Sequence, residues 1–278
     1  MQRRVRSILG AALSISLLVS ACGGGTTPAS EADIGLGLDT LPAADAAPAT
    51  TVVVTTTTTT VAPETTTTEA PDPHLTWIAT AHDDVEHLEV HDAPGGEPLS
   101  LPFLVPNPHQ FGGPLTVMVT EGEPGDEWVK VQIPLRPNGR EGWIRTEHYD
   151  LTSTRVRAEV VLSESRVVVY DGDTVLVESG AVIGAEESPT PLGTFYVAAK
   201  RRNPESEAWL GPWALVLSSY SEAFETFSGG LPVIAVHGTN RPDQLGEAIT
   251  NGCVRVPNDV IAVLAQHVPL GAPVTVLS

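Results

Sequence analysis

Two residues near the carboxyl end of this 278-residue chain, His237 and Cys253, have side chains suited to nucleophilic catalysis. The chain has only one other cysteine, Cys22, which lies close to the amino terminus. The thiolate is the reactive form of cysteine, and a neighbouring imidazole lowers the thiol pKa from about 8.5 toward neutrality. The sequence therefore predicts a cysteine nucleophile, Cys253, that is activated by His237.

Each of the two residues also has a purely structural interpretation. A single cysteine is commonly a small buried apolar side chain, and a single histidine is commonly a hydrogen-bonded scaffold residue. The local context favours catalysis, because the apolar run 233–236 predicts a strand that ends at His237. The turn Asn251-Gly252-Cys253 contains a glycine and is suited to directing backbone amides at an anionic intermediate.

The motifs around these residues resemble the L,D-transpeptidase catalytic domain, also called the YkuD domain. His237-Gly238-Thr239, a loop, and then Thr250-Asn251-Gly252-Cys253-Val254-Arg255 are similar to the signature of that family. The turn Thr190-Pro191-Leu192-Gly193-Thr194-Phe195 and the segment 271–274 resemble its other motifs, in the same order. The resemblance covers roughly residues 157–278. It departs at Asn251, where the family usually has a histidine that is not its base.

The resemblance implies a substrate and a reaction. The donor would be a peptidoglycan tetrapeptide stem, attacked between its meso-diaminopimelate-type residue and D-alanine. The acceptor would be the side-chain amine of another stem, so that the two steps of acyl transfer form a crosslink. No cofactor or metal ion is expected, and β-lactams of the carbapenem type are expected to acylate the cysteine.

Roles for the residues beside the cysteine follow from this mechanism. Backbone amides at Asn251, Gly252 and Cys253 would hold the oxyanion of the tetrahedral intermediate. The Gly238 carbonyl would orient the imidazole of His237, as the equivalent carbonyl does in the family.

Three residues are candidates for substrate contact: Arg255, Thr239 and Tyr220. Arg255 has two interpretations, since a guanidinium pairs equally well with a substrate carboxylate or with carboxylates of the protein that brace the loop.

The amino terminus predicts a lipoprotein signal peptide over residues 1–21. Three arginines precede an apolar run, residues 8–19, that is too short to span a bilayer and is followed by small residues and Cys22. Cleavage before Cys22 and its acylation would anchor the protein to the outer face of the cell membrane. A soluble export signal with an incidental cysteine is the alternative.

Amino-acid composition separates a linker from a small folded domain in the part of the chain between the signal peptide and residue 152. Residues 22–74 are rich in Thr and Pro and predict a disordered linker. Residues 75–152 have many turn signals and predict a small all-β domain. Its alternating segment 128–133, a Pro-Asn-Gly turn and the returning segment 142–144 indicate a hairpin and resemble a bacterial SH3-like barrel.

Residues 157–278 predict a catalytic domain that is rich in strands, so the fold class is mainly β, with one or few helices. Strands are expected at residues 159–162, 166–170, 174–177, 194–198, 213–217, 233–236 and 274–277. One helix is expected after the site, with Asn258 as its N-cap. Its apolar face is expected to contain four residues: Val260, Ile261, Val263 and Leu264.

The net charge excludes a nucleic-acid partner. The whole chain carries −19, and without the three arginines of the expected signal peptide 34 acids face 12 bases, which gives −22. No Lys/Arg cluster is present that would suit a phosphate backbone.

Three other functional classes compete with the transpeptidase. A cysteine peptidase or L,D-carboxypeptidase would use the same two residues with water as acceptor. A non-catalytic wall-binding lipoprotein would function through its β domain. A metal-dependent surface protein would use His82, His87 and His91, although their spacing fits no familiar zinc pattern.

Overall fold

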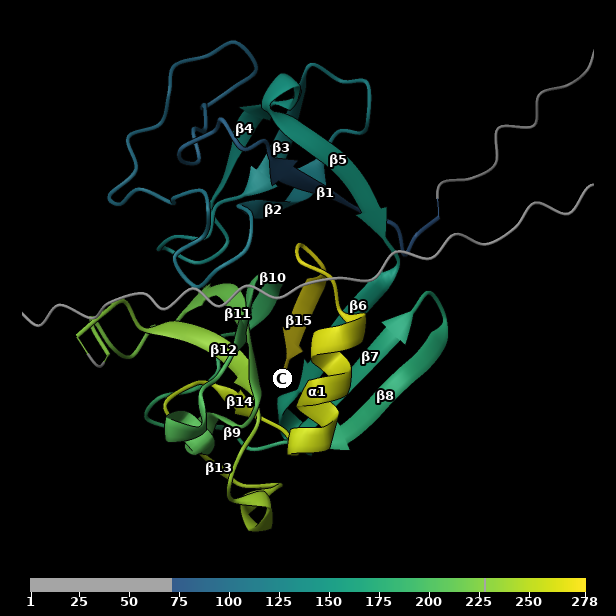
Figure 1. Cartoon of the computed structure of the whole chain (residues 1–278), viewed down its shortest axis with the longest axis vertical. Helices are drawn as coiled ribbons and strands as arrows, with labels where there is room; N and C mark the ends of the chain where they lie inside the picture. Colours follow the sequence, from purple (N-terminus) through teal and green to yellow (C-terminus); the bar gives the residue numbers. More distant parts are fainter. Residues whose placement is uncertain (1–71, 228) are drawn as a thin grey trace, which may run out of the picture. The chain divides into compact units, whose positions relative to one another are not determined.

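The computed structural model describes residues 72–227 and 229–278, which lie within one compact unit. These residues form fifteen strands, one α-helix and four short 3₁₀ helices (Figure 1). The predicted signal peptide, Cys22 and nearly all of the predicted linker lie outside the described residues. No helix in the described ranges is both long enough and apolar enough to cross a membrane.

An antiparallel sheet of five strands forms the amino-terminal part of the described chain, with the order β4-β3-β2-β1-β5 (Figure 1). Its elements are β1 (Thr76–Ala81), β2 (Thr116–Glu121), β3 (Trp128–Gln132), β4 (Glu141–Arg145), η1 (Thr146–His148) and β5 (Tyr149–Thr154). The hairpin predicted here is confirmed, because β3 pairs with β4 and places Val129 opposite Ile144. An SH3-like arrangement of these strands stays a prediction.

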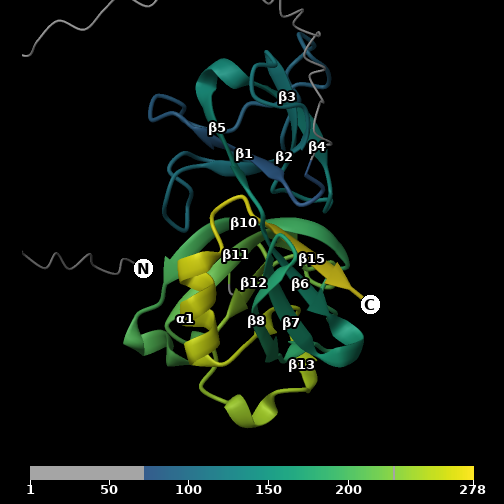
Figure 2. The ribbon, with the colours of Figure 1, turned by 90° about the vertical axis from the view of Figure 1, so that its right-hand side faces the viewer.

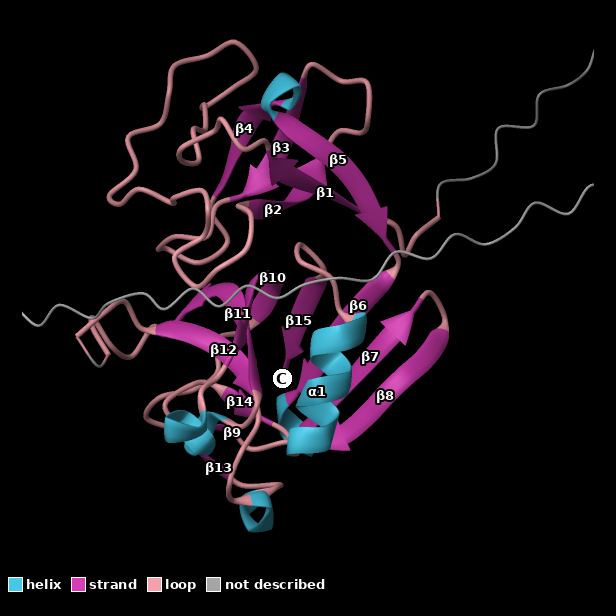
Figure 3. Ribbon diagram, in the orientation of Figure 1, coloured by secondary structure: helices cyan, strands magenta, loops and turns pink. Residues whose placement is uncertain are grey.

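A second sheet of eight strands follows, in the order β14-β12-β11-β10-β15-β6-β7-β8 (Figure 3). Its strands are β6 (Val156–Val161), β7 (Arg166–Asp171), β8 (Thr174–Gly180), β10 (Gly193–Arg202), β11 (Trp213–Tyr220), β12 (Val233–His237), β14 (Val254–Arg255) and β15 (Pro273–Leu277). The pairs β15–β6 and β12–β14 are parallel, and the other pairs are antiparallel. All seven strands predicted in this region are present, which confirms a mainly β fold.

Two short strands and three 3₁₀ helices lie between these strands in the chain. They are the parallel pair β9 (Ile183–Gly184) and β13 (Ala248–Thr250), and the 3₁₀ helices η2 (Leu162–Glu164), η3 (Glu205–Leu210) and η4 (Pro242–Gln244).

The helix α1 (Asn258–His267) packs on the eight-stranded sheet (Figure 2), and its Ile261 and Leu264 are buried in the core. Two expectations for this helix are wrong. Val263 is 39% exposed, so the apolar face is narrower than predicted. The N-cap is Pro257, which makes no side-chain capping bond, and Asn258 instead accepts a hydrogen bond from the Thr239 amide at 2.9 Å.

The two sheets share buried surface at β10. Tyr196 and Ala198 of β10 belong to the apolar cluster of the five-stranded sheet. Gln132 of β3 donates to the Thr194 carbonyl at 2.7 Å and accepts from Ser218 of β11 at 2.7 Å. A buried polar bridge of this kind is satisfied only when both sheets are present.

Candidate active site

Strand pairing brings His237 and Cys253 to the same face of the sheet. In the parallel pair β12–β14, Val236 lies opposite Val254 and His237 lies opposite Arg255. Side chains alternate between the faces of a strand, so Cys253 shares the face of His237 and Arg255. Val236 and Val254 point the other way and are buried in the core.

A cavity of about 530 Å³ opens over this face. His237, Asn251, Cys253 and Arg255 line it together with the β11 residues Ala214 and Val216. Aromatic and aliphatic side chains form the rest of its wall, among them Trp209, Phe224, Phe227 and Leu231. The cavity therefore combines one polar, reactive edge with an apolar surface, which is the composition of a site for a small organic ligand.

The imidazole of His237 is buried and oriented. Its side chain is 2% exposed, and Nδ1 lies 2.7 Å from the Gly238 carbonyl oxygen, the contact expected from the sequence. Since a carbonyl only accepts, Nδ1 carries the proton and Nε2 keeps a lone pair. The His237 pKa is lowered to about 4, mainly by burial and also by the charge of Arg255, while the carbonyls of Gly238 and Leu210 partly oppose this shift. The imidazole is therefore neutral near pH 7.

The thiol of Cys253 is also neutral in this structure. Burial raises its pKa, although a backbone hydrogen bond at Ala235 and the positive charge of Arg255 act in the opposite direction. The expected lowering of the thiol pKa by His237 is therefore wrong, because desolvation outweighs the favourable terms. Sγ lies 4.0 Å from the Val233 carbonyl oxygen, and within residues 72–227 and 229–278 no hydrogen bond joins it to His237.

The loop before the cysteine is held in one conformation. Gly252 has φ +107°, and a Cβ at this position would lie 2.8 Å from Ile234 Cδ1. The Thr250 hydroxyl donates to the Cys253 carbonyl at 2.6 Å and accepts from the Gly252 amide at 3.2 Å. The Gly252 amide is thus already used, which removes it from the predicted oxyanion donors. The amides of Asn251 and Cys253 have no hydrogen-bond partner in the described part of the chain.

Arg255 borders the cavity without an ionic partner. No carboxylate in the described residues lies within ion-pair distance of its guanidinium, and its buried Nε has no hydrogen-bond partner there. The interpretation that Arg255 braces the loop through protein carboxylates therefore has no support among these contacts.

The sequence around this site matches a known family. The profile of the L,D-transpeptidase catalytic domain, YkuD, matches residues 155–276. The matched segment is less than half of the chain, and it is similar to that catalytic domain. A Bacillus subtilis protein named as an L,D-transpeptidase, YkuD, is 33% identical over 94 residues, which are 34% of this chain and 49% of that protein. A second one, YqjB, is 30% identical over 112 residues, 39% of this chain and 63% of that protein.

The chain spans about half of the length of the first of these relatives. Among solved structures, an L,D-transpeptidase from Mycobacterium tuberculosis matches at 16% identity over 59% of this chain and 90% of that chain, with a TM-score of 0.40.

Two residues predicted to contact substrate do not line the cavity of the candidate site. Thr239 is 3% exposed, and its hydroxyl accepts a hydrogen bond from the Arg241 amide at 3.0 Å. Tyr220 is 6% exposed and donates to the Pro134 carbonyl at 2.8 Å, at the junction with the five-stranded sheet. Both predictions are wrong, because these side chains are committed to scaffold hydrogen bonds.

Sequence reasoning missed contacts that support the candidate site from the side opposite the cavity. Ser188 donates to the Thr250 carbonyl at 3.0 Å, and Thr190 accepts from the Gly184 amide at 3.0 Å. Trp209 presents an edge-on ring to His237, with 6.2 Å between ring centroids. The Thr190-Pro191 turn is recognisable as a motif, but its sequence does not show which backbone groups it contacts before the fold is known.

The five-stranded sheet holds one wall of the same cavity. Arg136 donates to the carbonyls of Ser221 and Phe224, and its guanidinium lies 3.3 Å from the Glu225 carboxylate. Asn138 forms hydrogen bonds with both the amide and the carbonyl of Tyr220, at 2.9 and 2.8 Å. The segment that carries Phe224 and Phe227 is therefore attached to the amino-terminal sheet.

Proposed function

We propose that the protein is a peptidoglycan L,D-transpeptidase that joins stem peptides through a Cys253 acyl-enzyme. The observation that carries the proposal is the shared face of β12 and β14, where Cys253, a neutral His237 and free loop amides meet at one cavity of an L,D-transpeptidase catalytic domain. A nucleophile, a base and oxyanion donors are the minimum set for acyl transfer.

The reaction begins from a neutral pair. As Sγ attacks the carbonyl carbon of the donor, Nε2 of His237 takes the thiol proton, so the thiolate forms only during attack. Backbone amides of Cys253 and Asn251 stabilise the oxyanion, each by roughly 3 kcal/mol if well aligned. The imidazolium then protonates the departing D-alanine amine, and a thioester remains. The acceptor amine attacks the thioester, His237 takes its proton, and the thiol is restored.

Arg255 supplies a positive charge on the sulfur side of this site. It lowers the pKa of both Cys253 and His237, so it favours the thiolate and disfavours a resting imidazolium. A tetrapeptide donor ends in a carboxylate one residue beyond the bond that is cut. We assign that carboxylate to the unpaired guanidinium of Arg255, because a charged pair is roughly twice as strong as a neutral hydrogen bond.

Incubation with a tetrapeptide stem tests the proposed function. With an added amine acceptor, the expected product is a crosslinked dimer detected by mass spectrometry, together with released D-alanine. Release of D-alanine alone, at the same rate with and without acceptor, would identify an L,D-carboxypeptidase instead. No release under either condition would contradict both enzymatic functions and favour the wall-binding interpretation.

The pH dependence of acylation tests the neutral resting pair. The base must be unprotonated, so kcat/KM is expected to fall about tenfold per pH unit below a pKa of about 4 and to stay level between pH 5 and 7. A thiolate–imidazolium resting pair would instead lose activity on the alkaline side as the imidazolium loses its proton. Stopped-flow measurement of the acylation rate across this pH range distinguishes the neutral pair from the thiolate–imidazolium pair. Recovery of the rate on return to pH 7 is the control for acid damage.

The same proposal places the enzyme outside the cytoplasm on a lipid anchor at Cys22. The short apolar run and the small residues before Cys22 support this location. Cys22→Ser is expected to remove lipid labelling and to move the protein from the membrane fraction to the supernatant. A wild-type protein that lacks lipid yet stays in the membrane fraction would contradict the anchor.

A further inference from the structure

The amino-terminal sheet carries a second large cleft, which the proposed reaction does not use. The cleft measures about 700 Å³ and is lined by residues of the segments 84–96, 127–128 and 145–149, and we call it the amino-terminal cleft. Trp128 at the start of β3, Arg145 at the end of β4 and Tyr149 at the start of β5 contribute to it. Strand ends and the segment 84–96 thus line it together.

One polar side chain of this cleft is mostly buried and has no hydrogen-bond partner among the described residues. Tyr149 is 6% exposed and lines the cleft, and its hydroxyl forms no hydrogen bond with any residue that the structure describes. Burial and the nearby Glu89 carboxylate raise the Tyr149 pKa, so the hydroxyl stays protonated. The hydroxyl oxygen itself is not fully enclosed, so it is open to a ligand in the cleft.

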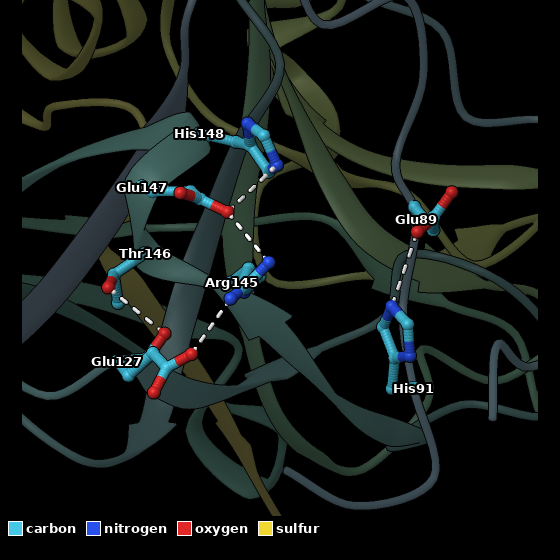
Figure 4. Close-up of polar contacts among 7 residues, drawn as sticks. All are labelled: Glu89, His91, Glu127, Arg145, Thr146, Glu147 and His148. Atoms are coloured by element: carbon cyan, nitrogen blue, oxygen red, sulfur yellow. Dashed lines mark hydrogen bonds and ion pairs between the residues drawn. The ribbon is translucent and has the colours of Figure 1, made fainter. Parts of the chain in front are cut away.

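The positive charge in the cleft is already neutralised. The Arg145 guanidinium lies 2.9 Å from Glu127 and 2.9 Å from Glu147 (Figure 4). It also covers the Trp128 ring at 5.7 Å. His148 lies 3.7 Å from the same Glu147 carboxylate. An anionic ligand therefore meets no free cation on this side.

Negative charge remains on the other side of the cleft. The Glu89 carboxylate is 67% exposed, and among the described residues its one ion pair is with the His91 imidazole, at 3.2 Å (Figure 4). Asp84 and Glu86 also line the cleft, and neither forms an ion pair with a described residue. No group of three side chains in the described ranges has the geometry to hold a metal ion. The unmatched charge therefore fits an organic cation.

We propose that the amino-terminal cleft binds a ligand through its protonated amine, which donates hydrogen bonds to the Tyr149 hydroxyl oxygen and the Glu89 carboxylate. The side-chain amine of an acceptor stem is such a group, and this identification of the ligand rests on the proposed function. The cleft would then hold amine-bearing stems close to the enzyme.

Calorimetric titration of the Cys253→Ala protein tests the cleft without any reaction taking place. The probe is Nα-acetyl-lysine methylamide, which has one free side-chain amine, and its Nε-acetylated form is the matched control ligand. We expect the amine probe to bind and the acetylated probe not to bind. Tyr149→Phe and Glu89→Gln are each expected to weaken binding about tenfold, because each removes one partner of a charged hydrogen bond.

Glu123→Gln provides the matched control protein. It removes the same charge from an exposed residue, in the turn between β2 and β3, that does not line the cleft, and we expect the affinity of this variant to be unchanged. Equal binding of the two probes, undetectable binding of the amine, or unchanged affinity in both Tyr149→Phe and Glu89→Gln would overturn the proposal. Because the protein in every titration lacks the thiol, these outcomes do not depend on whether the transpeptidase reaction occurs.

Discussion

Replacement of Cys253 by alanine is expected to abolish covalent labelling by a carbapenem, whereas the wild-type protein gains the mass of one β-lactam. The strained lactam carbonyl is an acyl donor that needs only a nucleophile and a base, so the experiment requires no natural acceptor. Cys253 is the free thiol of the described residues, and it lines the cavity of the catalytic domain. Intact mass measurement after a fixed incubation reads the result directly.

The companion variant His237→Ala is expected to react about 10²- to 10⁴-fold more slowly. The reason is specific to this site: burial raises the thiol pKa, so little thiolate exists near pH 7 unless a base removes the proton during attack. His267→Ala is the matched control, since His267 is an exposed imidazole in the last turn of α1. Its labelling rate is expected to equal that of the wild type.

Two results would contradict this assignment. An adduct that persists in the Cys253→Ala protein would place the reactive group elsewhere. A wild-type protein that forms no adduct, and whose thiol reacts with iodoacetamide at an ordinary rate, would indicate an unactivated cysteine and favour the wall-binding interpretation.

The chemistry of the site could be predicted from the sequence because it depends on residue types at fixed spacing. His237 ends an apolar run and Cys253 follows a glycine turn, so their local roles are visible before any fold is known. Strand β3 could be predicted for a similar reason, since the alternation of its side chains is a property of neighbouring residues. The parallel pair β12–β14 could not, because β14 has two residues, too few to show a period.

The errors share a physical cause, which is that side-chain partners distant in sequence decide the outcome. Asn258 has the right type for an N-cap, but the Thr239 amide, which lies 19 residues earlier, takes its oxygen. The Tyr220 hydroxyl donates a hydrogen bond to the carbonyl of Pro134, which follows strand β3 of the other sheet. The predicted lowering of the thiol pKa was wrong for the same reason. The direction of the pKa shift depends on how the fold buries Cys253, and not on which residues neighbour it in sequence.

The role of the amino-terminal sheet also emerged only from the structure. Sequence composition predicts a separate small domain, whereas Arg136 and Asn138 bind the backbone of the segment that carries the cavity residue Phe224. A loop without such attachments would be free to change the shape of the cavity. The sheet thus contributes to the geometry of the active site as well as carrying the amino-terminal cleft.

Gly252→Ala is expected to lower kcat/KM about a hundredfold, although it alters neither the nucleophile nor the base. An alanine at φ +107° is strained, and its Cβ would lie 2.8 Å from Ile234 Cδ1, a side chain that is 2% exposed and cannot move aside freely. The loop must therefore shift, and with it the Cys253 thiol and amide. Displacement of catalytic groups by about 1 Å typically reduces rates by this factor.

Gly246→Ala separates loop displacement from backbone strain. Gly246 has φ +93°, close to that of Gly252, but a Cβ there would meet no atom within 4 Å. Both variants are expected to lose roughly 1–2 kcal/mol of folding free energy from the left-handed backbone, measured by urea unfolding. Only Gly252→Ala is expected to lose activity, measured as the rate of carbapenem acylation. Equal rates in the two variants would show that the position of the Cys253 amide does not limit the reaction.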